Sequence, residues 1–132
     1  MLKKNLEKAM KEMGYYSLRT VQEIAYANFK ENTSFSLQAK TGAGKTVAFV
    51  LPCLEQIDKT DANTQILMIS PTRELALQTA SKTKQLASYT TIPVITCIGG
   101  IPIDKQINAL RHRPQVIIGT PGRLLDVYTQ GY

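Results

Sequence analysis

Short apolar or alternating runs are separated by helix-length segments over most of this 132-residue sequence. The runs are residues 34–38, 65–70, 93–98 and 115–119. The helix-length segments lie near residues 45–58, 73–88, 103–110 and 123–129. Strands rich in Ile, Val and Leu that alternate with helices are typical of a parallel sheet covered on both faces. The sequence therefore predicts a three-layer α/β fold.

Two helices are expected before the first of these runs. Residues 2–13 have the spacing of an amphipathic helix that ends at Gly14, with an apolar stripe of Leu2, Leu6, Ala9, Met10 and Met13. The second helix is expected to begin at Ser17 or Thr20, where Thr20 and Glu23 fit a capping box. Its expected apolar face is Val21, Ile24, Ala25 and Phe29. We thus expect amino-terminal helices over residues 1–31 and an α/β core over residues 34–132.

Composition and charge exclude several classes of protein. With 43% apolar and 20% charged residues, the sequence is typical of one globular domain and not of a disordered chain. No apolar stretch approaches the roughly 20 residues of a membrane span, and the amino terminus lacks the apolar core of a secretory signal. We expect a soluble, cytoplasmic protein without membrane partners. The formal charge of +6 weakly favours polyanion partners.

Cysteine and histidine offer little chemistry. Cys53 and Cys97 lie far apart in apolar surroundings, which favours buried free thiols over a disulfide, a metal site or a redox pair. His112 is the one histidine, so a histidine-based metal site and a catalytic triad within this sequence are both disfavoured.

Residues 39–46, with the sequence AKTGAGKT, follow the first run and open a helix-length segment. They match the phosphate-binding loop in its looser form, with Ala39 where the strict pattern has Gly. In such a loop the glycines let backbone N–H groups surround an anion, and the following helix N-terminus adds positive charge. We expect nucleotide binding by Thr41, Gly42, Ala43, Gly44, Lys45 and Thr46. Lys45 would contact the β- and γ-phosphates in catalysis, and Thr46 would place its hydroxyl on Mg²⁺.

The three later runs each end in residues that offer backbone N–H groups. Pro71-Thr72-Arg73 follows one run, Gly99-Gly100 the next and Thr120-Pro121-Gly122-Arg123 the last. Open α/β sheets bind ligands at the carboxyl ends of their strands. Such loops suit a phosphodiester backbone better than base edges, which predicts salt-sensitive binding with little sequence preference. Taken singly, each loop also fits ordinary helix capping, with Thr72 and Thr120 as caps.

In this order, the motifs make the sequence resemble the DEAD-box ATP-dependent RNA helicases. AKTGAGKT resembles motif I of that family, PTRELA motif Ia, Gly99-Gly100 the GG motif and TPGR motif Ib. The resemblance implies a RecA-like domain that uses ATP and Mg²⁺. It also implies RNA held through its sugar-phosphate backbone by Pro71, Thr72, Arg73, Gly100, Thr120, Pro121, Gly122 and Arg123.

The resemblance extends to residues 14–22, which are similar to the Q motif of the family. It implies that Tyr15 and Gln22 contribute to the nucleotide site and that Gln22 reads the adenine edge, since an amide both donates and accepts hydrogen bonds. The sequence departs from the motif at Leu18-Arg19, where the family usually has Pro-Thr. The family's upstream aromatic, which stacks on adenine, has no counterpart in this sequence.

Other family motifs are missing. The sequence contains no Asp-Glu-Ala-Asp, no Ser-Ala-Thr motif and no second RecA-like domain, which would be the partner that brings arginines to the γ-phosphate. We therefore expect a RecA-like fold truncated before the Asp-Glu-Ala-Asp strand, with open apolar sheet edges. Without an acidic group for Mg²⁺ and for the attacking water, these 132 residues alone are expected not to hydrolyse ATP or unwind RNA.

Two readings of function remain open on the sequence. The first is the amino-terminal part of an RNA-dependent ATPase. The second is a non-catalytic remnant that keeps the fold and binds RNA or protein. A small-molecule kinase is disfavoured because it would leave PTRELA and TPGR without a purpose.

Overall fold

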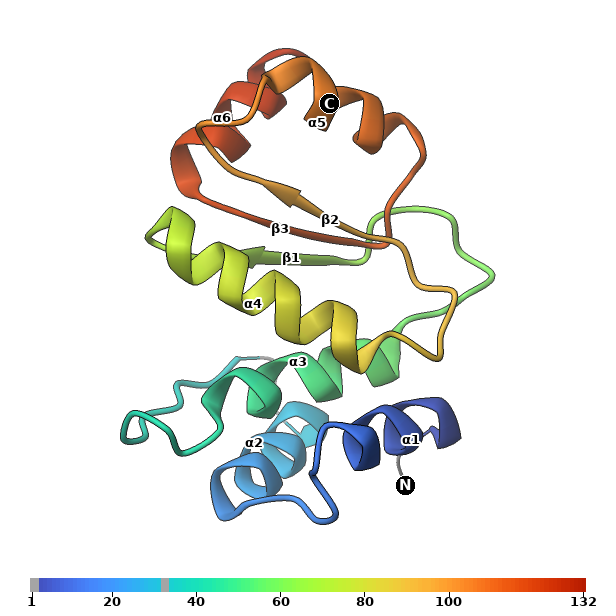
Figure 1. Cartoon of the computed structure of the whole chain (residues 1–132), viewed down its shortest axis with the longest axis vertical. Helices are drawn as coiled ribbons and strands as arrows, with labels where there is room; N and C mark the ends of the chain where they lie inside the picture. The colour runs from blue at the N-terminus through green and yellow to red at the C-terminus, as the bar shows by residue number, and fades with distance from the viewer. Residues whose placement is uncertain (1–2, 32–33) are drawn as a thin grey trace. The chain divides into compact units, whose positions relative to one another are not determined.

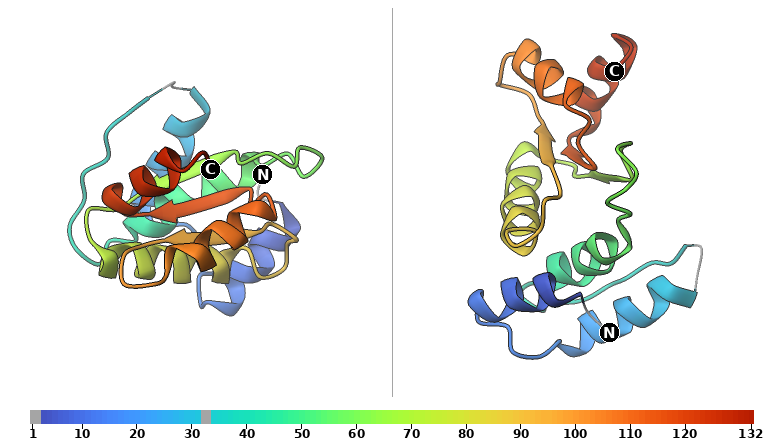
Figure 2. Two further views of the ribbon diagram at one scale, coloured as in Figure 1. Left: turned by 90° about the horizontal axis from the view of Figure 1, so that it is seen from above. Right: turned by 90° about the vertical axis from the view of Figure 1, so that its right-hand side faces the viewer.

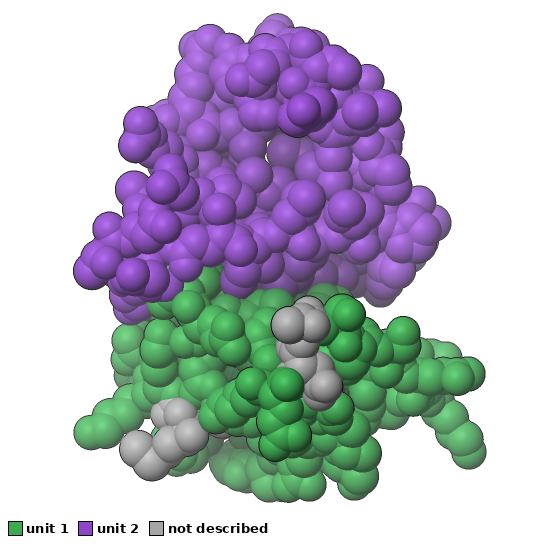
Figure 3. All heavy atoms as spheres, turned by 180° about the vertical axis from the view of Figure 1, so that it is seen from behind, with its two compact units in different colours: residues 1–57, 85–90 green, residues 58–84, 91–132 purple. Residues whose placement is uncertain are grey.

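The computed structural model describes residues 3–31 and 34–132. It divides into two compact units, coloured separately in Figure 3: unit 1 is residues 1–57 and 85–90, and unit 2 is residues 58–84 and 91–132. The phosphate loop (residues 39–46) therefore belongs to the same unit as the amino-terminal helices. The division proposed from the sequence, at residues 31–34, differs from this one.

Unit 1 contains the helices α1 (Lys4–Glu12), α2 (Thr20–Glu31) and α3 (Lys45–Gln56). Helix α1 buries Leu6, Ala9 and Met10 of the expected stripe, whereas Leu2 lies outside the described residues. As expected, α1 stops before Gly14, which has a φ of +83°. The N–H of Gly14 donates to Lys11 O, and the next N–H donates to Met10 O, so the last carbonyls of the helix are satisfied.

The apolar face expected for α2 is only partly correct. Ala25 is fully buried, but Ile24 is 50% exposed and the polar Gln22 is 1% exposed. The expected capping box is also absent, because Thr20 is already the first helical residue. Instead, the side chain of Gln22 reaches back and accepts a hydrogen bond from the backbone N–H of Arg19. A polar contact, not apolar periodicity, therefore decides which side of α2 is buried.

Unit 2 contains a parallel three-stranded sheet in the order β1-β3-β2 (Figure 1). Its strands are β1 (Ile66–Ile69), β2 (Val94–Cys97) and β3 (Val116–Gly119). Helix α4 (Arg73–Leu86), which belongs to this unit as far as Lys84, connects β1 to β2, and α5 (Ile103–Arg111) connects β2 to β3. The connection from β1 to β2 passes over β3, and the connection from β2 runs back to β3. Because parallel crossovers are right-handed, the two connections lie on opposite faces of the sheet. The views in Figures 1 and 2 agree, with α6 (Pro121–Thr129) on the side of α5.

The strand expected at residues 34–38 is not formed: this segment has no regular secondary structure. A strand is stabilised by hydrogen bonds to a neighbouring strand, and within the described ranges no strand pairs with it. The other three predicted strands and all four predicted core helices are confirmed, with ends that differ by one or two residues.

The outer strand β1 leaves apolar side chains uncovered. Leu67 is 57% exposed and Ile69 is 60% exposed, whereas Met68 between them is buried. This fits the expected open apolar edge. In the part of the chain that the structure describes, no helix has the length and apolar character needed to cross a membrane.

Gly119 is required where β2, β3 and α6 meet. A Cβ at this position would lie 2.5 Å from Cys97 O and 2.9 Å from the Leu124 side chain. The carbonyl belongs to a paired strand and cannot move aside. We expect Gly119→Ala to lower the free energy of unfolding by about 1–3 kcal/mol, measured by chemical denaturation.

Gly99→Ala is the matched control, because a Cβ there would meet no atom within 4 Å. The control is expected to unfold close to the wild type. Equal stability of the two variants would contradict the close packing at Gly119.

Candidate functional site

The phosphate loop is shaped by two glycines in the left-handed region. Gly42 has a φ of +82° and Gly44 a φ of +93°, a conformation that other residues adopt only with strain. Helix α3 begins directly afterwards at Lys45, and no side chain caps it. The Lys45 ammonium donates a hydrogen bond of 2.7 Å to Ala39 O. The loop therefore combines an uncapped helix N-terminus with a lysine, as an anion site requires.

Gln22 supports this loop from α2. Its Nε2 donates to Gly44 O at 3.3 Å, while its Oε1 accepts from the Arg19 N–H at 2.9 Å. A Cβ on Gly44 would lie only 2.5 Å from Nε2. The structure thus brings the predicted residues Gln22 and Gly44 together. The amide keeps one N–H and one acceptor lone pair for another partner.

The packing of α2 on α3 is fixed by a second polar contact that the sequence analysis missed. The Tyr26 hydroxyl donates to Glu55 Oε2, and the Lys30 ammonium lies 4.4 Å from the centre of the Tyr26 ring. Burial, together with the hydrogen bond and the charge of Glu55, raises the pKa of Tyr26 to about 12. This contact joins α2 to α3 about one helical turn after Gln22.

Tyr15, the other residue expected from the Q motif, lies in the turn between α1 and α2. Its backbone N–H donates to Met10 O at 2.8 Å, so this residue helps to end α1.

In unit 2, three loops follow the carboxyl ends of the strands, at residues 70–73, 98–102 and 120–123. All three begin at the same edge of the sheet. The register pairs both Ile69 and Cys97 with Gly119. The pairing continues into the loops, because the Ser70 N–H donates to Gly119 O and the Thr120 N–H to Cys97 O. The predicted nucleic-acid residues in these loops are mostly exposed, namely Pro71, Thr72, Arg73, Gly100, Pro121 and Gly122. These loops therefore form one exposed rim of the sheet.

The two threonines of the rim differ. The Thr72 hydroxyl accepts a hydrogen bond of 3.2 Å from the Leu75 N–H, so Thr72 caps α4 as expected. Thr120 stands at the N-cap of α6 but makes no side-chain capping bond, contrary to expectation. Pro121 occupies the first position of α6, where its missing N–H costs nothing.

Arg73 and Gly100 lie against each other on the rim. A Cβ on Gly100, which has a φ of +80°, would collide with the Arg73 guanidinium. The structure thus brings together two predicted residues from neighbouring loops. A glycine here lets a positive charge lie directly on the loop backbone.

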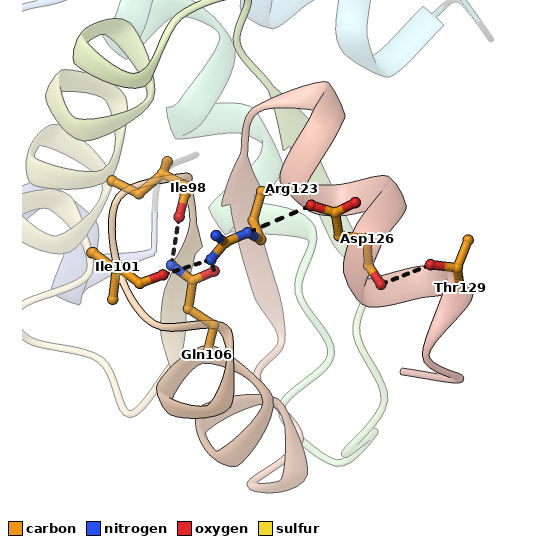
Figure 4. Close-up of polar contacts among 6 residues, drawn as sticks. All are labelled: Ile98, Ile101, Gln106, Arg123, Asp126 and Thr129. Atoms are coloured by element: carbon orange, nitrogen blue, oxygen red, sulfur yellow. Dashed lines mark hydrogen bonds and ion pairs between the residues drawn. The ribbon is translucent and has the colours of Figure 1, made fainter.

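Arg123 lies differently from the exposed rim residues, with a side chain that is 15% exposed. Figure 4 shows its guanidinium turned toward the loop after β2, where Nη1 donates to Ile101 O at 2.8 Å and to Gln106 Oε1 at 2.9 Å. Gln106 Nε2 in turn donates to Ile98 O at 2.8 Å. Asp126 is 3.9 Å from Arg123 Nε. These contacts hold both ends of the loop that carries Gly99 and Gly100.

The sequence analysis did not identify Gln106 as a residue that holds the loop after β2, although its position on α5 pointed to such a role. It lies with Ile107 on the buried side of α5, where an uncharged polar side chain is unusual without a partner. A buried glutamine next to a glycine-rich loop therefore points to a contact that fixes the loop backbone.

The pKa values of both cysteine thiols are raised, which disfavours the reactive thiolate form. Burial raises the pKa of Cys53 to about 11, and it raises the pKa of Cys97 more than the charge of Arg123 lowers it. Both cysteines are free thiols in the structure, Cys97 buried and Cys53 partly exposed. Across residues 3–31 and 34–132, no cluster of three or more His, Cys, Asp or Glu side chains could hold a metal ion.

Comparison with known proteins gives consistent results. The family model for "DEAD/DEAH box helicase" matches residues 19–132. The chain is 42% identical over 125 residues to "ATP-dependent RNA helicase CshA" of Limosilactobacillus reuteri, covering 95% of this chain and 25% of the relative. It is 42% identical over 123 residues to "ATP-dependent RNA helicase DbpA" of Escherichia coli K12, covering 92% and 27%.

Solved structures are similar over nearly the whole chain. A hypothetical ATP-dependent RNA helicase from Sulfolobus tokodaii matches with a TM-score of 0.86 and 34% identity, covering 98% of this chain and 37% of that one. Dbp5 of S. cerevisiae bound to RNA and ADP BeF3 matches with a TM-score of 0.81 and 30% identity, covering 98% and 32%. These matches confirm the expected RecA-like α/β fold. The chain spans about a quarter of the length of the first curated relatives.

The contacts of Arg123 predict a stability effect. Gln106→Ala would leave Ile98 O and part of the Arg123 guanidinium without their buried partner. We expect a loss of about 1–3 kcal/mol in the free energy of unfolding, measured by chemical denaturation. Asn108→Ala, an exposed change on the same helix, is the control and is expected to have little effect. The interpretation of Gln106 would be wrong if both variants unfolded at the same denaturant concentration.

Proposed function

Since the chain belongs to the DEAD/DEAH box helicase family, we propose that it is the ATP- and RNA-binding part of an ATP-dependent RNA helicase. One observation carries the proposal: a phosphate loop of the required shape occurs in the same chain as a rim of strand-end loops with exposed N–H groups and Arg73. Either feature alone would fit many nucleotide-binding or α/β proteins. Cytoplasmic localisation is part of the same proposal.

The nucleotide is proposed to bind along residues 41–46. Thr41, Gly42 and Gly44 surround the phosphates with backbone N–H groups, and Ala43 joins them by exchanging its N–H bond to Lys40 O. Lys45 exchanges its bond to Ala39 O for the β- and γ-phosphates. The fit is supported by the left-handed conformation of Gly42 and Gly44 and by the uncapped start of α3 at Lys45. Thr46 is the candidate protein ligand for Mg²⁺, a hard cation suited to hydroxyl and phosphate oxygens. When bound, Mg²⁺ neutralises charge on the phosphates.

Gln22 is proposed to read adenine with the donor and the acceptor that its internal bonds leave free. Tyr15, from the same motif, is proposed to line the nucleotide site.

RNA is proposed to lie across the rim of unit 2. Pro71, Thr72, Arg73 and Gly100 would contact its sugar-phosphate backbone from two loops, and Thr120, Pro121 and Gly122 from the third. The uncommitted hydroxyl of Thr120 supports such a contact. We propose that Arg123 acts mainly by holding the loop at residues 98–102, because its Nη1 already makes two bonds to that region.

Hydrolysis and unwinding are proposed for the complete helicase. There a second RecA-like domain would be the partner that completes the γ-phosphate site. The 132 residues alone are proposed not to hydrolyse ATP, because their sequence contains no Asp-Glu-Ala-Asp motif to hold Mg²⁺ and orient the attacking water.

Lys45→Ala tests nucleotide binding. Removal of the ammonium deletes a charge-assisted contact to phosphate, so ATP should bind roughly a hundredfold more weakly, in a fluorescence titration with Mg²⁺. Lys59→Ala, which removes an exposed lysine from a loop of unit 2, is the control. Unchanged ATP affinity of Lys45→Ala would contradict the proposed function.

A comparison of ATP with GTP tests the role of Gln22. The free N–H and lone pair of its amide complement adenine, whereas guanine presents the opposite pattern. We expect ATP to bind about tenfold more tightly than GTP in the wild type. Gln22→Ala should remove most of that preference. Equal affinities of the wild type for both nucleotides would exclude base reading by Gln22.

Arg73→Gln tests the RNA rim. Because Arg73 would contact phosphate and no base, the variant should bind all RNA sequences more weakly by a similar factor. Its affinity should also depend less on salt, by about one unit of slope in a logarithmic plot. Lys105→Gln on the exposed side of α5 is the control. An effect confined to one RNA sequence would show that Arg73 reads bases.

A further inference from the structure

Arg19 contacts the phosphate loop from the start of α2. Its Nη1 donates a hydrogen bond of 2.7 Å to Gly42 O. Its Cδ lies 3.5 Å from where a Cβ on Gly44 would stand, so the stem of the side chain lies over the second glycine of the loop. Arg19 is also one of the two residues at which the sequence departs from the Q motif. The departure thus places an additional cation on the loop.

Two cations rest on carbonyl oxygens of this loop. Lys45 donates to Ala39 O and Arg19 to Gly42 O, each at 2.7 Å. Neither forms an ion pair with a carboxylate among the residues that the structure describes. Both side chains are exposed. Their positive charges are therefore uncompensated, and an anion bound to the loop would be a stronger partner than a neutral carbonyl.

The space beside Arg19 is large enough for a ligand to reach it. A hollow of about 580 Å³ lies within unit 1, between the start of α2 and residues 36–39. Its other lining side chains are uncharged, namely Thr20, Val21, Ile24, Ser36, Leu37, Gln38, Ala39 and Ala43. Arg19 therefore supplies the charge of this hollow, at the side where the phosphate loop begins.

We propose that Arg19 is a second phosphate-binding cation of the nucleotide site, which exchanges Gly42 O for the phosphate chain of a nucleoside di- or triphosphate. This inference rests on the proposed nucleotide binding. It assigns Arg19 a role in affinity that depends on charge. A merely structural Arg19 would brace Gly42 through a hydrogen bond to a neutral carbonyl, which salt affects little.

The test is the affinity of the protein for ADP, titrated at about 50 mM and about 500 mM salt, because screening weakens exposed charge pairs. Arg19→Gln should bind ADP about tenfold more weakly at low salt and clearly less than that at high salt. Arg19→Lys, which keeps the charge, should retain most of the affinity. Lys4→Gln removes an exposed lysine from α1 of the same unit and should match the wild type at both salt concentrations.

Two results would overturn the inference while the proposed function stands. In one, Arg19→Gln binds ADP as the wild type does, although Lys45→Ala has lost binding. In the other, Arg19→Gln loses the same factor at both salt concentrations and Arg19→Lys is equally weak, which indicates bracing of the loop. If Lys45→Ala binds ADP as tightly as the wild type, the proposed function itself fails.

Discussion

Parallel pairing of β1 and β2 with β3 is the constraint on which the rim of unit 2 depends. The central strand places Ile69, Gly119 and Cys97 side by side, so three segments far apart in the sequence leave the sheet together. Hydrogen bonds from Ser70 and Thr120 extend this pairing one residue into the loops. The rim needs no long side chains for its shape, since the ladder itself aligns the backbone groups.

Polar side chains hold the loop segments that strand pairing does not position. Gln106 and Arg123 hold the loop after β2, and Arg73 lies on the backbone of Gly100. In unit 1, Gln22 holds the phosphate loop through Gly44 O. In both units a carbonyl of a glycine-containing loop accepts a hydrogen bond from a buried glutamine, which fixes the shape of the loop. A loop held in this way can present its remaining N–H groups to phosphates, as proposed for a nucleotide and for an RNA backbone.

Much of the fold and the site follows from local sequence patterns. The helices, three strands and the phosphate loop could be predicted because apolar spacing, capping residues and glycine positions are properties of short segments. The strand predicted at residues 34–38 was wrong, because a strand requires a pairing partner and none occurs among the described strands. The apolar face of α2 was only partly predicted for a similar reason, since Ala25 is buried as expected but Gln22, which contacts the phosphate loop, is buried in place of Ile24.

The direction in which a side chain points was the second property that could not be predicted from the sequence. Arg73 and Arg123 occupy similar places after their strands, yet Arg73 is exposed and Arg123 is largely buried against Ile101 and Gln106. No local pattern distinguishes an exposed arginine from one that holds a loop. The buried Gln106 indicated that a polar contact holds this loop. Its partner, Ile98 O, could be identified only from the structure.

Backbone hydrogen exchange tests the central claim most directly, because the claim concerns which N–H groups bind phosphate. ATP with Mg²⁺ should slow exchange at residues 41–47, and RNA should slow exchange at residues 72, 73, 99–101, 122 and 123. Protection by each ligand at its own set of loops is the result we expect. The claim would be contradicted if saturating ATP left the amides of residues 41–47 unprotected, or if bound RNA left all three strand-end loops unchanged.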